Sequence, residues 1–378
     1  MERDELAAWL RLALTPEVGS AAARRLLAAF GLPATVFGQP AAALAQVITV
    51  AQASALQSEP EALSAQIAAT WQWLHETQPP GQRRILTLAD ADYPAGLLNT
   101  EDPPLMLYLM GEVRAPWPAG IAVVGSRNPT PQGLANARRF SRSFAQAGLT
   151  VVSGLALGVD AAAHEGALEG AAAGQLATIA VVGTGLDRVY PRQHLELARR
   201  IAHEGLLVSE YPLGTPPLSA NFPKRNRIIA ALSQGTLVVE AALRSGSLIT
   251  ARLAAEQGKD VFAIPGSIHS PQSRGCHALL KQGAKLVETA QDVLEEIALP
   301  QARPAQRAAN AANAPVHPGG SRESGLLASL GFDPVSLDAL VARTGVAPAQ
   351  LQAQLLELEL QGEVARLPGG LFQRVGAG

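Results

Sequence analysis

The sequence predicts an α/β protein built around an extended, Rossmann-like, doubly wound and mostly parallel sheet, with a helical domain before it and a winged-helix domain behind it. Two observations predict the sheet. Short apolar, β-rich runs recur between residues 121 and 288, and helical stretches of about 10 to 15 residues separate most of them. The length of 378 residues further indicates that the chain forms two or three domains.

Residues 1–76 are predicted to form the helical domain. Apolar side chains recur there at helical spacing, at Leu6, Trp9, Leu10 and Leu14. A turn follows, with Ser20 as the expected N-cap of a second helix over 21–30. Two helices joined in this way resemble a helix-hairpin-helix element, whose backbone N–H groups can meet a phosphate. A small helical packing domain is the alternative, because no Lys lies near the hairpin.

The remaining boundaries follow from composition. Residues 77–109 are rich in Pro and are expected to be an ordered connector, and 300–323 a flexible linker. Between them, 110–299 should form the Rossmann-like domain, and 324–378 a winged-helix-like domain of helices followed by a hairpin. The predicted strands of the sheet are 121–124, 150–153, 178–182, 206–209, 236–240, 260–264 and 285–288.

Charge and cysteine content restrict the function. The formal net charge is −2, so affinity for nucleic acid must come from a local patch. Residues 120–299 have a local excess of positive charge, with 17 basic against 14 acidic side chains. The single cysteine, Cys276, excludes an internal disulfide framework and a multi-cysteine metal site. Neither a signal peptide nor a membrane span is expected, so we predict a cytoplasmic protein. We also predict that it has no cofactor.

The loops after the strands should carry the binding site, because ligands of parallel α/β sheets bind at the carboxyl ends of the strands. Five of these loops contain Gly or Ser, which suits a phosphate-binding rim. The candidates are Gly125, Ser126 and Arg127 after the first of these strands, Gly154 after the second, Arg192 after the third, and Gly246 and Ser247 after the fifth.

The segment 221–227 is the most informative. Pro223 suits the first turn of a helix, where the helix dipole favours carboxylates by about 0.3–1 kcal/mol each. The sequence places Lys224, Arg225 and Arg227 there instead, which is unfavourable unless an anion is bound. Phe222 adds a ring that can stack on a base. Alternatively, one Arg pairs with a core carboxylate such as Glu240, and Phe222 is simply buried.

The sequence resembles the DNA processing protein A (DprA/Smf) family over about residues 90–290. The matching strings are, in order, VVGSR, VSGLALGVDAAAH, TIAVVGTGLDRVYP, LVSEYPLGTPP, NFPKRNRIIAALS, LVVEAALRSGSLITA and VFAIPGS. His194 departs from the family, where Asn is common. The resemblance also fits a sterile-alpha-motif-like domain in front and a winged-helix domain behind.

The resemblance implies a non-catalytic protein that binds single-stranded DNA, dimerises through its Rossmann-like domain and loads RecA during natural transformation. Family DNA contacts map onto Arg127, Arg192, Phe222, Lys224, Arg225 and Arg227. Together with the rim, the predicted DNA-binding residues are Gly125, Ser126, Arg127, Gly154, Arg192, Asn221, Phe222, Lys224, Arg225, Asn226, Arg227, Gly246 and Ser247.

Two enzyme classes are the alternatives. Phosphoribohydrolases of the lysine-decarboxylase-like Rossmann group carry a Pro-Gly-Gly-x-Gly-Thr-x-x-Glu string, but residues 245–250 are followed by no Glu before Glu256. A dinucleotide-dependent oxidoreductase would need a G-x-G-x-x-G turn, which the first strand lacks. Asp160 and His164, four residues apart, are expected to form a hydrogen-bonded structural pair rather than an acid–base dyad.

The winged-helix domain is expected to contact protein or support a dimer rather than read duplex DNA. Its presumed recognition helix, over 349–354, contains neither Lys nor Arg. A helix that reads DNA needs cations to position it on the phosphates.

Overall fold

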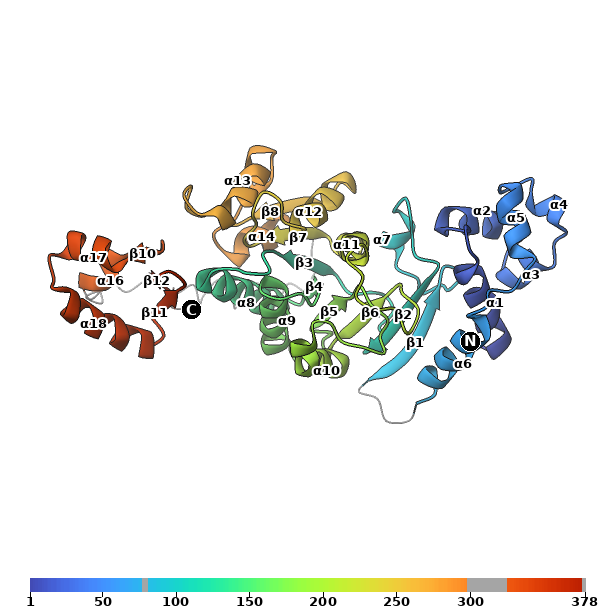
Figure 1. Ribbon diagram of the computed structural model, residues 1–378, viewed down its shortest axis with the longest axis horizontal. Helices are drawn as coiled ribbons and strands as arrows, with labels where there is room; N and C mark the ends of the chain where they lie inside the picture. Colours follow the sequence, from blue (N-terminus) through green and yellow to red (C-terminus); the bar gives the residue numbers. More distant parts are fainter. Residues whose placement is uncertain (77–80, 298–324, 376–378) are drawn as a thin grey trace, which may run out of the picture.

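The computed structural model describes residues 1–76, 81–297 and 325–375. Figure 1 shows the α/β domain at the centre, the N-terminal helices at the right and the C-terminal helices with their hairpin at the left. The predicted linker 300–323 and residues 77–80 of the predicted connector lie outside the described residues. None of the helices in the described ranges is long and apolar enough to cross a bilayer.

The N-terminal domain is helical, as its apolar spacing predicts. Its helices are α1 (Arg3–Leu14), α2 (Ser20–Phe30), α3 (Pro33–Phe37), α4 (Ala41–Leu44), α5 (Val50–Leu56) and α6 (Leu63–Leu74). The expected cap is displaced by one residue, because Gly19 is the N-cap of α2 and Ser20 its first helical residue.

The sheet begins earlier than the sequence predicts. Strands β1 (Gln82–Thr87) and β2 (Met106–Gly111) pair antiparallel, and β2 continues antiparallel onto β6 (Leu206–Ser209). Most of the expected connector 77–109 is therefore part of the α/β domain. Its strand signal is weak because β1 is an edge strand whose first three residues are exposed or only half-buried.

The predicted parallel strands are all present, with ends that shift by a residue or two. Besides β6 they are β3 (Gly120–Val124), β4 (Thr150–Ser153), β5 (Thr178–Val181), β7 (Gly235–Val238), β8 (Asp260–Ala263) and β9 (Lys285–Leu286). The strand order is β1-β2-β6-β5-β4-β3-β7-β8-β9. The chain thus builds outward from β3 in one direction and returns to continue from β7 in the other, which makes β3 and β7 the switch point of the sheet.

Helices cover both faces of the sheet, since residues of one strand alternate between two apolar clusters. One face packs against α8 (Pro131–Gln146), α9 (Val159–Gly170) and α14 (Ala290–Glu296). The other packs against α7 (Ala95–Leu98), α11 (Asn221–Ala231), α12 (Ser247–Glu256) and α13 (Arg274–Lys281). Helices α8 and α9 touch closely, because a Cβ at Gly166 would lie 2.1 Å from the backbone oxygen of Arg138.

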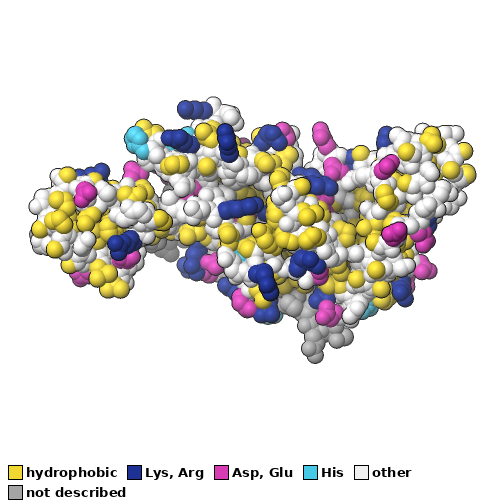
Figure 2. Space-filling view, in the orientation of Figure 1, with side chains coloured by type: hydrophobic (Ala, Val, Ile, Leu, Met, Phe, Trp, Pro, Cys, Tyr) yellow, Lys and Arg dark blue, Asp and Glu magenta, His cyan; other side chains and the backbone are white. Residues whose placement is uncertain are grey.

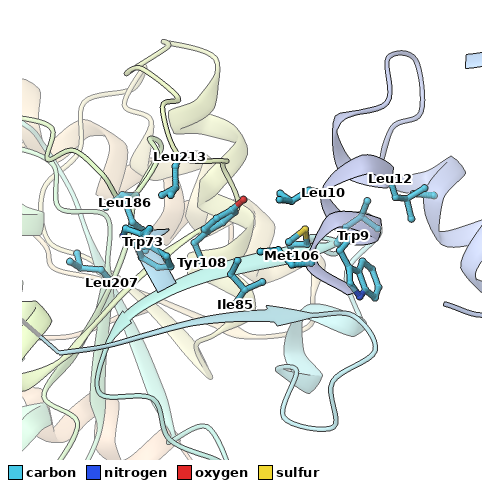
Figure 3. Packing of buried hydrophobic residues seen from close by; sticks show 14 of the residues in the cluster. Trp9, Leu10, Leu12, Trp73, Ile85, Met106, Tyr108, Leu186, Leu207 and Leu213 are labelled. Carbon is cyan, nitrogen blue, oxygen red and sulfur yellow. The ribbon is translucent and has the colours of Figure 1, made fainter. Parts of the chain in front are cut away.

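The N-terminal domain is packed onto the antiparallel edge of the sheet. One apolar cluster contains Trp9 and Leu10 of α1, Trp73 of α6 and Tyr108 of β2, together with residues of α10 (Leu195–Glu204). Figure 3 shows Trp73 beside Tyr108, and their ring centroids lie 6.0 Å apart at 62°. This shared core holds the helical domain against the sheet.

The C-terminal domain has the predicted order of elements. It contains α16 (Gly325–Leu330), β10 (Val335–Ser336), α17 (Leu337–Thr344), α18 (Pro348–Leu360), β11 (Val364–Leu367) and β12 (Leu371–Arg374). The strands form a small sheet in the order β10-β12-β11. Gly345 ends α17 in the left-handed conformation, with φ +68°, which a residue with a side chain adopts at a cost.

Candidate nucleic-acid interface

A cavity of about 700 Å³ opens at the switch point of the sheet. The loop after β3 supplies residues 125–128, the loop after β7 supplies 242 and 244–247, and α11 supplies its first turns. The charged, aromatic and amide side chains that line the cavity include Arg127, Asp160, Tyr190, Phe222, Arg225, Asn226 and Arg244. The cavity lies at the carboxyl ends of the strands, where the sequence predicts the binding site.

Glu240 joins the two loops at the switch point. Its carboxylate accepts hydrogen bonds from the backbone N–H of Thr130 at 2.9 Å and from the Thr130 hydroxyl at 2.6 Å. Its backbone oxygen accepts from Ser126 N at 2.7 Å. Burial raises the pKa of Glu240, and the Thr130 donors oppose that shift. Glu240 therefore braces the cavity wall and does not pair with an Arg of α11. The alternative that the sequence left open, an Arg paired with a core carboxylate, is instead met by Asp160 for Arg225 and by Glu210 for Arg227.

Two rings and one guanidinium form a stack at the mouth of the cavity. The Tyr190 and Phe222 ring centroids lie 5.5 Å apart at 36°, and Cζ of Arg127 lies 5.6 Å from the Phe222 centroid. Tyr190 is 47% exposed, so its ring is accessible from solvent. The stack offers flat faces next to a positive charge, which suits a nucleobase joined to a phosphate.

Arg225 is not an exposed cation. It is 3% exposed, donates from Nη1 to the backbone oxygen of Val181 at 2.7 Å, and has Nη2 3.9 Å from the Asp160 carboxylate. Gly154 lies against it so closely that a Cβ there would be 1.6 Å from Nη1. Burial lowers the pKa of Arg225 to about 10 and raises that of Asp160, while each opposes the other's shift. Arg225 supports the cavity floor.

Arg227 is also held by an internal acid. Its guanidinium is paired with the Glu210 carboxylate and lies 3.7 Å from Asp102. Lys224 is about half exposed and reaches Glu210 at 4.0 Å. This corrects the expectation that all three cations of the first turn face a bound anion. Asp160 and Glu210 supply negative charge at this helix end from within the protein, and only Lys224 remains open to solvent.

The other predicted residues fall into two groups. Gly125, Ser126, Asn226, Gly246 and Ser247 line the cavity, whereas Gly154, Arg192, Asn221, Lys224 and Arg227 do not. Several polar side chains fix the walls: Asn226 donates to Gly246 O at 3.2 Å, and Asn221 donates to Gly183 O at 3.0 Å. Arg192 is exposed in the short 3-10 turn Arg192–His194, two residues beyond Tyr190.

Among the cavity residues absent from the predicted set, one aromatic and one cationic side chain suit a nucleic-acid site. Tyr190 and Arg244 both line the cavity, and each lies two positions before a predicted residue, Arg192 and Gly246, in loops that follow strands. Position after a strand was the signal that could have found them. Arg127, Arg192 and Arg244 are exposed, and none forms an ion pair with any residue in the described ranges. Figure 2 shows Lys and Arg side chains spread over this central domain.

His164 fixes the loop after β4 rather than pairing with Asp160. Its Nδ1 lies 2.7 Å from the Thr178 hydroxyl, and its Nε2 accepts from the backbone N–H of Leu155 at 3.3 Å. The Thr178 hydroxyl donates to Val151 O, so Nδ1 carries the proton and the neutral ring has a partner at each nitrogen. Leu155 has a φ of 56°, which is a strained conformation for a residue with a side chain.

This environment makes stability depend on pH. Burial lowers the pKa of His164 from 6.5 to about 3, so below pH 6.5 the unfolded chain binds a proton that the folded chain does not. The free energy of unfolding should therefore be fully retained above pH 6.5 and fall by up to about 1.4 kcal/mol per pH unit below it from this group. Urea unfolding at pH 6 and pH 5 should show a shallower decrease for His164→Gln; equal decreases would contradict the assignment.

Within the described residues, no three His, Cys, Asp or Glu side chains are arranged to hold a metal ion. Cys276 is buried, and that burial raises the pKa of its thiol to about 12. Its side chain faces the backbone oxygens of Val238 and Val239 at 3.7 and 3.8 Å, so it is a core residue of the α/β domain.

Two family models and several curated proteins match this chain. Residues 84–298 match the model of the family described as DNA recombination-mediator protein A, and residues 308–370 match the DprA winged helix domain. Protein Smf from Escherichia coli is 44% identical over 285 residues, which is 75% of each chain. DNA processing protein DprA from Streptococcus pneumoniae is 46% identical over 210 residues, which cover 56% of this chain and 73% of that protein.

Two solved structures are also similar. The X-ray structure of DNA processing protein A from Streptococcus pneumoniae has a TM-score of 0.65 at 34% identity, covering 79% of this chain and 99% of that one. A structure of DNA processing protein A from Helicobacter pylori, described for its single-stranded DNA binding mode, has a TM-score of 0.51 at 33% identity and covers 56% of this chain and 95% of that one.

Proposed function

Because this chain belongs to the DprA/Smf family of DNA recombination mediators, we propose that it binds single-stranded DNA in the cavity at the switch point of its sheet. The observation that carries the proposal is the combination of the Tyr190–Phe222 ring pair with Arg127 and Arg244 in one cavity. Cations without internal partners take phosphates, and the rings take bases at about 1–3 kcal/mol each.

The same arrangement favours a single strand over a duplex. The stack needs access to the face of a base, and in a duplex those faces are covered by the neighbouring base pairs. Arg192 and Lys224, exposed beside the cavity, would extend the contact to neighbouring phosphates.

The salt dependence of binding tests this proposal. If Arg127, Arg192, Lys224 and Arg244 each meet one phosphate, the logarithm of the binding constant should fall with the logarithm of salt concentration at a slope of about −3. Fluorescence anisotropy of a labelled oligonucleotide across a salt series measures the slope. Equal affinity for single- and double-stranded oligonucleotides, or a slope near zero, would contradict the proposal.

A binding protein rather than an enzyme is further supported by the carboxylates of the cavity. Asp160 is the single Asp or Glu among the residues that line it, and Asp160 is buried beside Arg225 and accepts a hydrogen bond from Ala156 N at 3.3 Å. No carboxylate there is free to act as a general base. Release of free base from nucleoside monophosphates by the purified chain would contradict this.

We further propose that the chain acts in the cytoplasm as a homodimer that loads RecA on incoming DNA during natural transformation. Support comes from family membership and, for the dimer, from exposed apolar side chains near the β8–β9 end of the sheet: Leu243 is 59% exposed, Ile268 74% and Leu286 54%. Sedimentation of the chain tests the dimer. The rate of RecA assembly on an oligonucleotide, measured with and without the chain, tests loading. An unchanged rate would contradict the proposed loading of RecA.

A further inference from the structure

The outward face of α18 carries a row of apolar side chains. Ala349, Ala353, Leu356 and Leu360 lie four, three and four residues apart, which places them along one side of the helix. Leu356 is 56% exposed and Leu360 83%, whereas Leu351 and Leu355 are buried in the domain core. We call this row the α18 face. In Figure 2, hydrophobic and acidic side chains lie at the α18 position of the C-terminal domain, with Lys or Arg side chains of the same domain nearby.

Negative charge borders the α18 face at its C-terminal end. Glu357 and Glu359 belong to the last turns of the helix, and Glu363 follows it closely. None of the three forms an ion pair with any residue of the described ranges. The helix dipole adds partial negative charge at the same end. No Lys or Arg occurs between Pro348 and Leu360 to offset it.

From these observations we infer that the α18 face binds an amphipathic helix of another protein, whose own apolar stripe is bordered by Lys or Arg. Leu356 and Leu360 would pack against the apolar stripe of the bound helix. The three carboxylates would pair with its Lys or Arg side chains and so fix the direction in which that helix lies. Duplex DNA does not fit, since its phosphates would approach three carboxylates with no cation on the helix. A second copy does not fit either, because its own α18 has no Lys or Arg to meet the three carboxylates.

The experiment uses the full chain and two labelled probes: a synthetic helical peptide with a leucine stripe bordered by Lys, and the same peptide with Glu in place of Lys. Fluorescence anisotropy should show binding of the Lys peptide and at least tenfold weaker binding of the Glu peptide. Leu356→Ser with Leu360→Ser should weaken the Lys peptide at least tenfold. Glu357→Gln with Glu359→Gln should weaken it at low salt and flatten its salt dependence.

Val50→Ser is the matched control, because Val50 is 74% exposed in the N-terminal domain and should leave peptide binding unchanged. Circular dichroism and urea unfolding verify that each variant is folded. The inference is overturned if both peptides bind equally, or if the leucine variant binds the Lys peptide as tightly as the parent. It is also overturned if that variant loses duplex DNA binding in a gel shift, or loses self-association in sedimentation.

Discussion

Replacing Arg127 and Arg244 together by Glu should weaken binding to a single-stranded oligonucleotide by at least about 100-fold at moderate salt, or about 2.7 kcal/mol. Both guanidinium groups line the cavity, are exposed, and have no ion-pairing partner in the described residues. Each reversal turns an attraction to phosphate into a repulsion. The salt slope should become shallower too, from about −3 towards −1.4, because about two phosphate contacts remain.

Arg139→Glu with Arg142→Glu is the matched control. These side chains are exposed on α8, do not line the cavity, and produce the same change in net charge. If the bulk charge of the protein governed binding, both double variants would lose affinity equally. Equal loss would refute the cavity as the DNA site, and an unchanged free energy of unfolding in both would show that only binding is affected.

Arg225→Ala should instead destabilise the fold, by about 3–5 kcal/mol, because it leaves the Asp160 carboxylate buried without its cation. It also removes the hydrogen bond to Val181 O and leaves a void beneath Gly154. Urea unfolding at neutral pH measures the loss. A surface cation that only met DNA would change the free energy of unfolding by less than about 0.5 kcal/mol.

The double variant Arg225→Ala with Asp160→Asn shows how much of the lost stability comes from the unpaired Asp160 carboxylate. Removing the Asp160 charge together with that of Arg225 should recover part of the lost stability, because a neutral amide costs less to bury than a carboxylate. Losses that simply add would show that the two groups act independently and that the electrostatic pairing of Arg225 with Asp160 is unimportant.

The parallel strands and the position of the site could be predicted from the sequence because their signals are local. A strand such as β4, buried on both faces, is a continuous run of apolar residues whatever surrounds it. The loops after such strands then hold the binding residues. Strand β1 lacks this signal because it contains two arginines: Arg83 pairs with Glu76 beside the N-terminal domain and Arg84 pairs with Asp92. Only its pairing with β2 identifies it as a strand.

Which cations are available for binding was decided by tertiary structure alone. Arg127, Arg225 and Arg227 are alike in the sequence, as cations in loops or first turns after strands. Folding brings Asp160 to Arg225 across 65 positions and Glu210 to Arg227 across 17, while it leaves Arg127 and Arg244 open at the cavity. Ion pairing depends on distance in space, and the sequence determines which charges exist but not which of them meet.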